Sequence, residues 1–204
     1  MKKVKELSVK EQQEIELDIL KYLDKVLTDN QIRYFAAYGT LLGAVREKGF
    51  IPWDDDVDLW VFRKDIPKII QVIKNSPHEG FFLQTFQSDP ETIVPEMIRI
   101  CVDNTYKWPE KCENEKFHTG IFLDIFPLDY GFETSQDAQD MKRASILHIM
   151  LWKSLGLGNQ GLTLKGKAAY FIARILPRRF FQHEMLKIDK ESSKSGASKM
   201  RALR

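Results

Sequence analysis

The sequence predicts an α+β fold in which helices flank a β-sheet and a helical part follows it. Three observations predict this class. An amphipathic helical pattern covers residues 9–27, short apolar segments lie between residues 32 and 130, and helical spacing returns after residue 134. With 204 residues, 43% of them hydrophobic and 29% charged, the chain can bury a full core and does not resemble a disordered protein.

The first element is an amphipathic helix over residues 9–27. Ser8 and Glu11 have the spacing of a capping box, which satisfies two backbone amides at a helix start. Six apolar residues then recur at helical spacing and form one stripe: Ile15, Ile19, Tyr22, Leu23, Val26 and Leu27. We expect this stripe to pack on the sheet.

The second segment has the order strand, glycine, hydroxyl, helix, which is typical of phosphate sites. Residues 32–38 predict a strand that stops at Gly39 and Thr40, and residues 41–47 predict a short helix. Gly39 would let a phosphate approach the backbone, and the Thr40 hydroxyl would point at the anion with the first helix amides. An ordinary strand-to-helix turn has the same residues, so the pair alone is a weak signal.

Two further residues of this short helix have predicted roles. Gly43 costs about 1 kcal/mol relative to alanine inside a helix, so it indicates close packing or close approach of a substrate. Arg46 could clamp a phosphate. Both predictions depend on the acidic segment that follows.

Four carboxylates stand within five positions at Asp54, Asp55, Asp56 and Asp58, directly before the apolar strand 59–62. In an extended chain Asp56 and Asp58 point the same way, about 7 Å apart. At an effective dielectric of about 20 they repel by about 2 kcal/mol. We therefore expect a bound cation, Mg²⁺ or else Mn²⁺, because Mg²⁺ takes a few carboxylates together with substrate phosphate oxygens.

The acidic segment has two other interpretations. Asp54, Asp56 and Asp58 have the spacing of a calcium loop, but Leu59 replaces its required glycine and Asp65 its final glutamate, so calcium is rejected. A charged turn that only precedes a strand remains an alternative.

Asp124 is a single carboxylate inside the apolar segment 120–127, which we expect Pro127 to end. A buried carboxylate needs a metal, a hydrogen-bonding partner or a raised pKa. If its strand adjoins that of Asp56 and Asp58, three carboxylates converge. The alternatives are a helix cap or an ion pair with Arg99, whose own role is either to hold donor phosphates or to form such a pair.

The remaining elements complete the sheet and the helical part. Asp65 is expected to cap a helix to Lys74, and a helix from Thr134 or Ser135 to about Leu155 precedes a glycine-rich loop over 156–161. Further strands are predicted at residues 81–86 and 97–102.

The sequence indicates an intracellular enzyme. No apolar segment follows the lysine-rich start, and no apolar stretch approaches the roughly 20 residues needed to span a bilayer. Cys101 and Cys112 are too few for a disulfide framework, and with His118 they match no zinc spacing. We therefore predict a cytoplasmic protein with two ordinary thiols.

Charge is distributed unevenly along the chain. Residues 160–204 carry eleven Lys and Arg against three Asp and Glu, although the whole chain has a net charge of only +2. Basic and apolar residues alternate at helical spacing over 165–181, so this helix could lie on the inner face of an anionic membrane. A helix that packs its stripe on the domain is the favoured interpretation. Nucleic-acid binding is not expected, because no base-stacking aromatic motif is present.

The stretches Tyr38-Gly-Thr-Leu-Leu-Gly-Ala-Val-Arg-Glu-Lys-Gly-Phe-Ile-Pro-Trp-Asp-Asp-Asp-Val-Asp-Leu59 and Gly120-Ile-Phe-Leu-Asp-Ile-Phe-Pro-Leu-Asp129 closely resemble the LicD family of phosphotransferases. The resemblance implies a nucleotidyltransferase-like mixed sheet flanked by helices, with residues 1–131 as the catalytic core and 132–204 as a basic helical region of the same compact unit. It further implies that Asp56, Asp58 and Asp124 are catalytic metal ligands, and that Gly39 and Thr40 form the glycine-hydroxyl element.

The function implied by this resemblance is transfer of a phosphorylated small alcohol, typically phosphocholine, from a CDP-linked donor to a sugar hydroxyl. The acceptor would be a surface glycan such as lipopolysaccharide or teichoic acid, either free or lipid-linked. In this mechanism Arg46 and Arg99 contact the donor, and Asp55 or Asp124 accepts the hydroxyl proton. Two alternatives stay open: a nucleotidyltransferase acting on a small molecule or protein, and a non-catalytic binding module.

Overall fold

The computed structural model describes residues 6–107, 112, 115–131, 135–157, 163–192 and 199–202. The chain forms two compact units that interleave along the sequence. The first contains residues 1–83, 99–107 and 120–126, and the second contains residues 84–98, 108–119 and 127–204. The predicted division of the chain at residue 131 stays a prediction.

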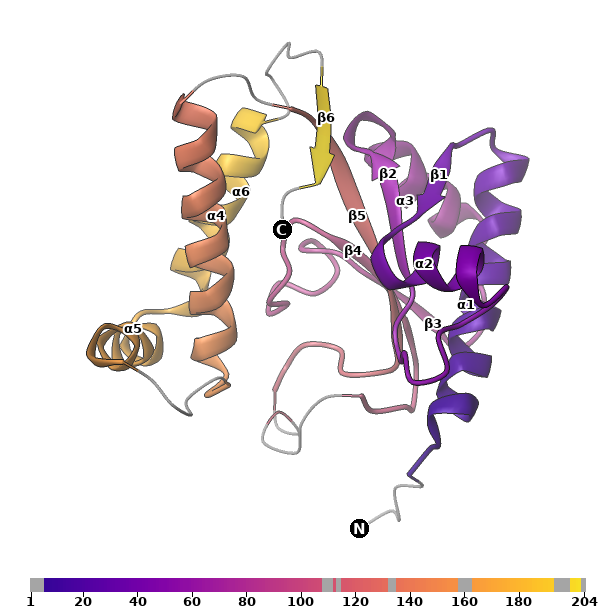
Figure 1. Ribbon diagram of the computed structural model, residues 1–204, viewed down its shortest axis with the longest axis horizontal. Coiled ribbons are helices and arrows are strands. Elements are labelled where there is room, and N and C mark those ends of the chain that lie inside the picture. The colour runs from indigo at the N-terminus through magenta and orange to yellow at the C-terminus, as the bar shows by residue number, and fades with distance from the viewer. Residues whose placement is uncertain are drawn as a thin grey trace. The chain divides into compact units, whose positions relative to one another are not determined.

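A mixed β-sheet forms the centre of the fold, with the strand order β1-β2-β5-β4-β3 and with β6 paired to the end of β5. β1 runs antiparallel to β2, whereas β2 and β5 run in the same direction (Figure 1). The α+β fold class with helices flanking a mixed sheet is therefore confirmed. The strands are β1 (Tyr34–Ala36), β2 (Asp58–Phe62), β3 (Phe81–Gln84), β4 (Ile98–Val102), β5 (Phe122–Gly131) and β6 (Lys199–Ala202).

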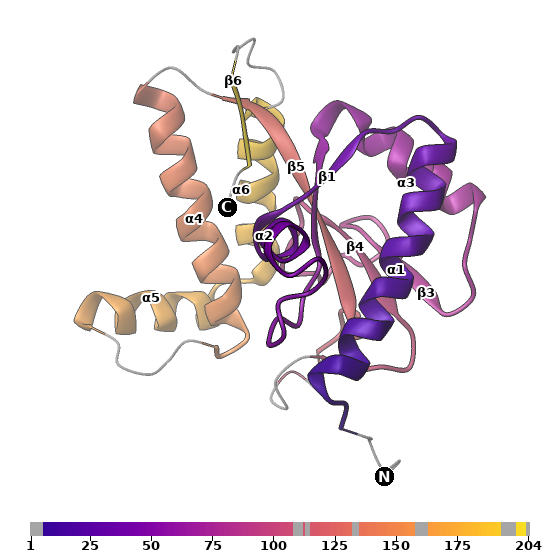
Figure 2. The same cartoon turned by 45° about the vertical axis from the view of Figure 1, so that its right-hand side comes forward.

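The predicted first helix is present as α1 (Val9–Asp29), and its capping box is formed, with the Ser8 side chain accepting from the Glu11 amide. Its stripe enters the core, where Ile19, Leu23 and Leu27 are all fully buried. Each such side chain stabilises the fold by about 1.5–3 kcal/mol. α1 lies beside α3 (Ile66–Asn75) along the sheet (Figure 2).

The short helix α2 (Tyr38–Arg46) begins earlier than predicted, so Gly39 and Thr40 lie in its first turn. The expected strand ends at Ala36 because the backbone turns at Tyr38, whose φ of 43° lies in the left-handed region. That conformation costs about 1–2 kcal/mol for a residue with a side chain. Aromatic packing offsets it, since the Tyr38 ring contacts Trp60 and Phe126 at centroid distances of 4.9 and 5.6 Å.

Gly43 is explained by packing. A Cβ atom at this position would lie 2.6 Å from the carbonyl oxygen of Gly49 and 3.1 Å from the amide nitrogen of Ile51. Both are backbone atoms, so a side chain at this position would require the backbone of residues 49–51 to shift. The close-packing interpretation of Gly43 is therefore confirmed.

The structure corrects two predictions about strand and helix ends. β5 continues through Pro127 to Gly131 and pairs with β6 from Leu128 onward, so Pro127 lies inside the strand and does not end it. Asp65 occupies the N-cap position of α3, as predicted, but its side chain makes no capping bond, and the chain enters α3 through the 3₁₀ turn Arg63–Asp65.

The second unit is built mainly from α4 (Ser135–Ser154), α5 (Leu164–Ile175) and α6 (Arg178–Ser192). The basic segment 165–181 forms two helices because Pro177 cannot continue α5. The apolar stripe is exposed on α5, whereas Phe181 of α6 is buried, so the favoured packing interpretation was wrong for α5. Gly156, at φ 77°, turns the chain after α4, while Thr134 and the predicted loop residues 158–161 lie outside the described residues.

Among the described residues, no helix combines the length and the hydrophobicity that a membrane-spanning helix needs. Cys101 and Cys112 are both buried.

Candidate active site

The acidic segment lies in the first unit, where α2 begins and β2 begins. Asp58 is the first residue of β2 and is only 5% exposed. Its amide donates to Thr40 Oγ1 at 2.9 Å, and its carbonyl accepts from the Ala37 amide at 2.9 Å. These two bonds hold the first turn of α2 directly against the start of β2.

Asp124 lies on the neighbouring strand β5 and is 7% exposed. Its amide donates to the Val57 carbonyl at 3.0 Å. In a parallel pair this bond places Asp124 beside Asp58, on the same face of the sheet. Asp58 and Asp124 are 66 positions apart in the sequence, but they lie side by side in the sheet.

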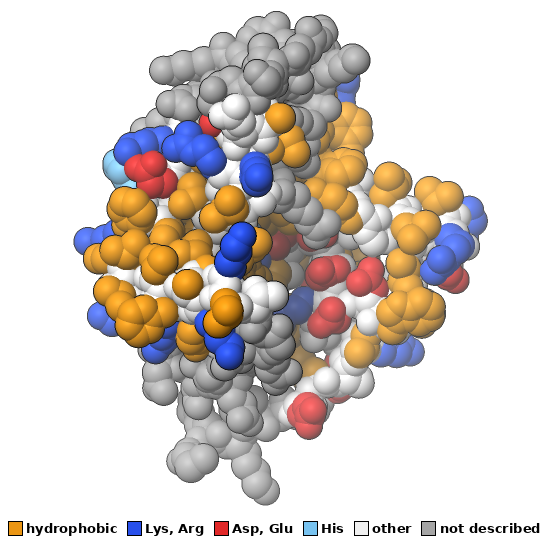
Figure 3. Space-filling model, turned by 60° about the vertical axis from the view of Figure 1, so that its left-hand side comes forward, with side chains coloured by type: hydrophobic (Ala, Val, Ile, Leu, Met, Phe, Trp, Pro, Cys, Tyr) orange, Lys and Arg blue, Asp and Glu red, His pale blue; other side chains and the backbone are white. Residues whose placement is uncertain are grey.

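Negative charge accumulates around Asp56, which is half-buried. Burial raises the pKa of its carboxyl, and the charges of Asp54, Asp55 and Asp124 raise it further, against an opposing effect of Lys107. The Asp56 carboxylate therefore interacts electrostatically with carboxylates from both stretches of the chain. Figure 3 shows acidic side chains gathered together on the surface. A bound cation would relieve this repulsion.

Asp54 covers the start of α2. A Cβ atom at Gly39 would lie 2.5 Å from Asp54 Oδ2, so only glycine leaves room for the carboxylate in this position. The first amides of a helix have no partner within the helix and attract anions. A carboxylate now lies where Gly39 was predicted to admit a phosphate.

Arg99 and Asp124 form a buried ion pair. The Arg99 Nε atom donates to Asp124 Oδ1, and Nη2 donates to Oδ2 at 3.0 Å. The guanidinium lies over the Phe122 ring, 3.9 Å from its centroid. The alternative in which Asp124 pairs with Arg99 is therefore the one present in this structure.

A metal site with three protein carboxylates is not formed in this arrangement. Across the part of the chain that the structure describes, no three His, Cys, Asp or Glu side chains lie close enough together to hold a metal ion. In the same structure Arg99 holds both oxygens of Asp124. Asp56 and Asp58 still suit Mg²⁺, which is commonly bound by one or two carboxylates and by substrate phosphates. The raised pKa of Asp56, to which burial and the neighbouring carboxylates contribute, supports that fit.

Unlike the buried carboxylates, Arg46 and Asp55 are exposed. Arg46 is at the opposite end of α2 from Gly39 and pairs with Glu47, with Nε 2.5 Å from Oε1. The structure thus does not bring Arg46 together with Asp58. Asp55 has an exposed side chain, and its carbonyl accepts from Gln12 Nε2 at 2.7 Å.

A buried acid near the site was missed by sequence reasoning. Glu16 of α1 is 0% exposed, and its Oε1 atom accepts from Lys107 Nζ at 2.9 Å and from Gln12 Nε2 at 3.2 Å. Lys107 also donates to the Asp55 carbonyl, so the pair connects α1 to the acidic segment. The Glu16 Oε2 atom has no hydrogen-bond partner among the described residues.

Burial strongly perturbs Glu16. It raises the pKa of the carboxyl to about 7, although Lys107 acts in the opposite direction. One signal could have revealed this residue: Glu16 precedes Ile19 by three positions and Leu23 by seven, so it falls on the buried stripe of α1. Lys107 could not have been found this way, because it lies 91 positions from Glu16.

Comparison with known proteins identifies relatives of this chain. Residues 31–148 match a protein family described as LicD/FKTN/FKRP, nucleotidyltransferase domain. The chain is 33% identical over 126 residues to the lipopolysaccharide cholinephosphotransferase LicD of Haemophilus influenzae, which is 62% of this chain and 46% of that protein. It is 35% identical over 131 residues, 64% of this chain and 40% of the relative, to an uncharacterized protein of Rickettsia typhi.

A shorter similarity reaches an animal protein. Over 46 residues the chain is 44% identical to the human ribitol 5-phosphate transferase FKRP, which is 22% of this chain and 9% of that protein. The chain therefore spans less than half the length of each of these relatives.

Proposed function

Because the chain belongs to the LicD/FKTN/FKRP nucleotidyltransferase family, we propose that it transfers a phosphorylated small alcohol from a CDP-linked donor to a sugar hydroxyl of a cell-surface glycan. Phosphocholine is the first candidate, because the Haemophilus influenzae relative is named a lipopolysaccharide cholinephosphotransferase. The observation that carries the proposal is the position of Asp58, buried beside Asp124 and bonded to the first turn of α2.

Asp56 and Asp58 would hold the metal ion, Mg²⁺ or Mn²⁺, with Asp124 as the neighbouring third carboxylate. When bound, such an ion neutralises the charge of a diphosphate and of the departing nucleotide. The chain supplies the half-buried setting, in which the repulsion among Asp54, Asp55 and Asp56 favours a cation.

The start of α2 would orient the donor. Gly39 and Thr40 present backbone amides at a helix N-terminus, which is a favourable place for a phosphate. Asp54 has to move from its place over Gly39 for the donor to bind there. Arg99 would hold Asp124 in place, and the position of Arg46 gives it no part in this scheme.

The reaction is a single phosphoryl-type transfer. The acceptor hydroxyl oxygen forms a bond to the phosphorus that carries the small alcohol, and the bond from that phosphorus to the bridging oxygen breaks. CMP departs with the electron pair. We assign the hydroxyl proton to Asp55, because its side chain is exposed while Arg99 engages both oxygens of Asp124.

A donor screen tests the proposal. Purified protein with Mg²⁺ is incubated with CDP-choline, CDP-ethanolamine, CDP-glycerol or CDP-ribitol and a cell-envelope glycan extract, and CMP release is measured. Release that depends on one donor, on the extract and on intact Asp58 supports the proposal. No release from any of the four donors contradicts it. CDP-ribitol is included because the human relative is named a ribitol 5-phosphate transferase.

Nucleotide transfer is the second candidate, because the family description names a nucleotidyltransferase domain. The two reactions differ in which half of the donor reaches the acceptor. CDP-choline labelled in the choline or in the cytidine distinguishes them. A binding module would bind the nucleotide without releasing CMP.

The cytoplasmic location of the protein stays a prediction.

A further inference from the structure

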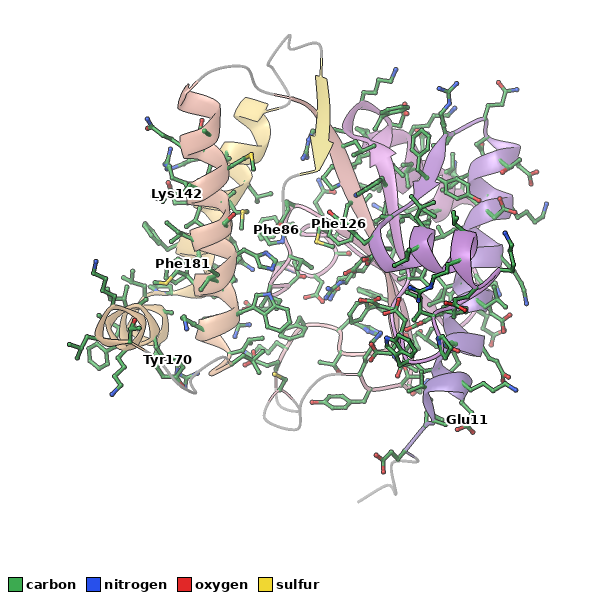
Figure 4. All side chains as sticks on the ribbon, viewed as in Figure 1. Glu11, Phe86, Phe126, Lys142, Tyr170 and Phe181 are labelled. Carbon is green, nitrogen blue, oxygen red and sulfur yellow. The ribbon has the colours of Figure 1, made fainter. Side chains whose placement is uncertain are left out.

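Helix α5 exposes an apolar face. Leu164 is 86% exposed, Phe171 is 66% exposed and Ile175 is 63% exposed, although soluble helices normally bury their apolar stripe. The opposite side packs within the second unit, where Ala173 is 1% exposed. Tyr170, labelled in Figure 4, lies on this packed side with its hydroxyl close to Gly156. The helix is therefore amphipathic, with its apolar face turned outward.

Cations border this face on both sides. With about 100° of rotation per residue, Leu164, Phe171 and Ile175 lie within about 40° of one another, Lys165 lies about 100° to one side and Lys167 about 60° to the other. Both lysines are exposed, and α5 contains no Asp or Glu. Figure 3 shows hydrophobic side chains gathered over the helical part of the molecule, with Lys and Arg side chains around them.

We propose that α5 is a membrane-docking helix that lies in the surface of an anionic lipid bilayer. An exposed apolar stripe bordered by lysines has the chemistry of helices that lie in the headgroup region, with the stripe in the acyl boundary and the ammonium groups among lipid phosphates. Charge complementarity selects this occupant over a second copy of the chain. A symmetric pairing of two α5 faces would bring four lysines together with no acidic residue on either helix.

Vesicle sedimentation tests the proposal. The protein is mixed with phosphatidylcholine vesicles or with vesicles that also contain phosphatidylglycerol, and bound protein is measured. We expect binding to the anionic vesicles that weakens as salt is added. Lys165→Gln and Lys167→Gln should each weaken binding about fivefold. Phe171→Ser with Ile175→Ser should weaken it at least about tenfold.

A matched control uses Val9→Ser with Leu17→Ser, which removes two exposed aliphatic side chains from α1. This variant should sediment like the wild type. Equal sedimentation of the α5 double variant and the wild type, or no binding of the wild type to anionic vesicles, overturns the proposal. Circular dichroism on each variant ensures that the comparison is made on folded protein.

An environment-sensitive dye reports directly on α5. Both native cysteines are buried, so Ile172→Cys provides a selectively labelled site on the exposed side of the helix. A blue shift of the dye on addition of anionic vesicles supports docking. No shift with vesicles, or a shift that follows protein concentration without vesicles, overturns the proposal, and the second result identifies another copy as the occupant.

The membrane-docking proposal and the proposed transferase reaction can be tested independently of each other. The α5 double variant lies outside the residues assigned to the reaction, so CMP release with a detergent-dispersed acceptor should be unchanged. Loss of vesicle binding with intact CMP release supports membrane docking by α5. Equal loss of CMP release in solution attributes the defect to the catalytic unit and contradicts a docking role.

Discussion

Replacement of Glu16 by glutamine should remove a pH-dependent cost of folding. The Glu16 carboxyl is 0% exposed and its pKa is raised by burial to about 7, from a usual value of 4.5. The folded protein therefore holds a proton between those pH values that the unfolded chain releases. Stability from this group is fully present below pH 4.5 and is lost as the pH rises through about 7.

The size of the effect follows from the shift. At about 1.4 kcal/mol per pKa unit, the shift corresponds to about 3 kcal/mol between pH 4.5 and pH 7.5. Glutamine has nearly the same shape and does not titrate. Lys107 keeps its bond to the Asp55 carbonyl and its place over the Phe122 ring, 4.8 Å from the centroid.

Urea unfolding of both proteins from pH 5 to pH 8 measures this difference. We expect the free energy of unfolding of the wild type, relative to Glu16→Gln, to fall by about 2–3 kcal/mol across the range. Comparison with Glu14→Gln, an exposed acid on the same helix, corrects for general effects of lost charge. A difference that stays constant across this pH range would refute the assignment of a buried, proton-binding carboxylate.

Three further predictions concern the elements around the site. Gly43→Ala should lower the free energy of unfolding by about 1–3 kcal/mol, because its Cβ would meet the Gly49 carbonyl at 2.6 Å, whereas Gly49→Ala has open space and should leave the melting temperature nearly unchanged. Arg99→Met should destabilise the protein by about 3–5 kcal/mol in urea unfolding by leaving the Asp124 charge buried, and the double variant with Asp124→Asn should regain part of that loss. Thr40→Val should cost about 1 kcal/mol and lower CMP release, because the Asp58 amide loses its acceptor; Thr40→Ser keeps the hydroxyl and should retain both, and equal effects of the two would contradict this role.

Local chemistry made much of the fold predictable from the sequence. Ser8 and Glu11 act on amides a few positions away, so the start of α1 could be predicted from a short window. The strand character of residues 59–62 followed from their apolar run after the acidic segment. The reason for Gly43 could be narrowed to two, and the approach of the Gly49 carbonyl decided between them.

Long-range packing set the parts that the sequence pattern missed. Tyr38 adopts a left-handed backbone conformation because Trp60 and Phe126 hold its ring, and neither contact is local. Pro127 lies inside β5 because the strand continues into its pairing with β6, a contact between distant parts of the sequence. The exposure of the α5 stripe likewise depends on which face of the helix packs within the second unit.

The candidate site shows the same division. Asp54, Asp56 and Asp58 could be found as a cluster because they are adjacent in the sequence. The approach of Asp124 was an expectation that depended on strand order, and its bond to Val57 supplies that order. The pairing of Asp124 with Arg99 was one of several open alternatives, because a sequence does not show which partner a buried charge selects.

The most direct test of the central claim is a Mn²⁺ titration followed by electron paramagnetic resonance, with and without CDP-choline. We predict that the wild type binds Mn²⁺, that the nucleotide strengthens binding, and that Asp58→Asn weakens it at least about tenfold. Asp65→Asn, just beyond the same strand, should bind like the wild type. Equal Mn²⁺ affinity in Asp58→Asn and the wild type, with or without the nucleotide, would contradict the account.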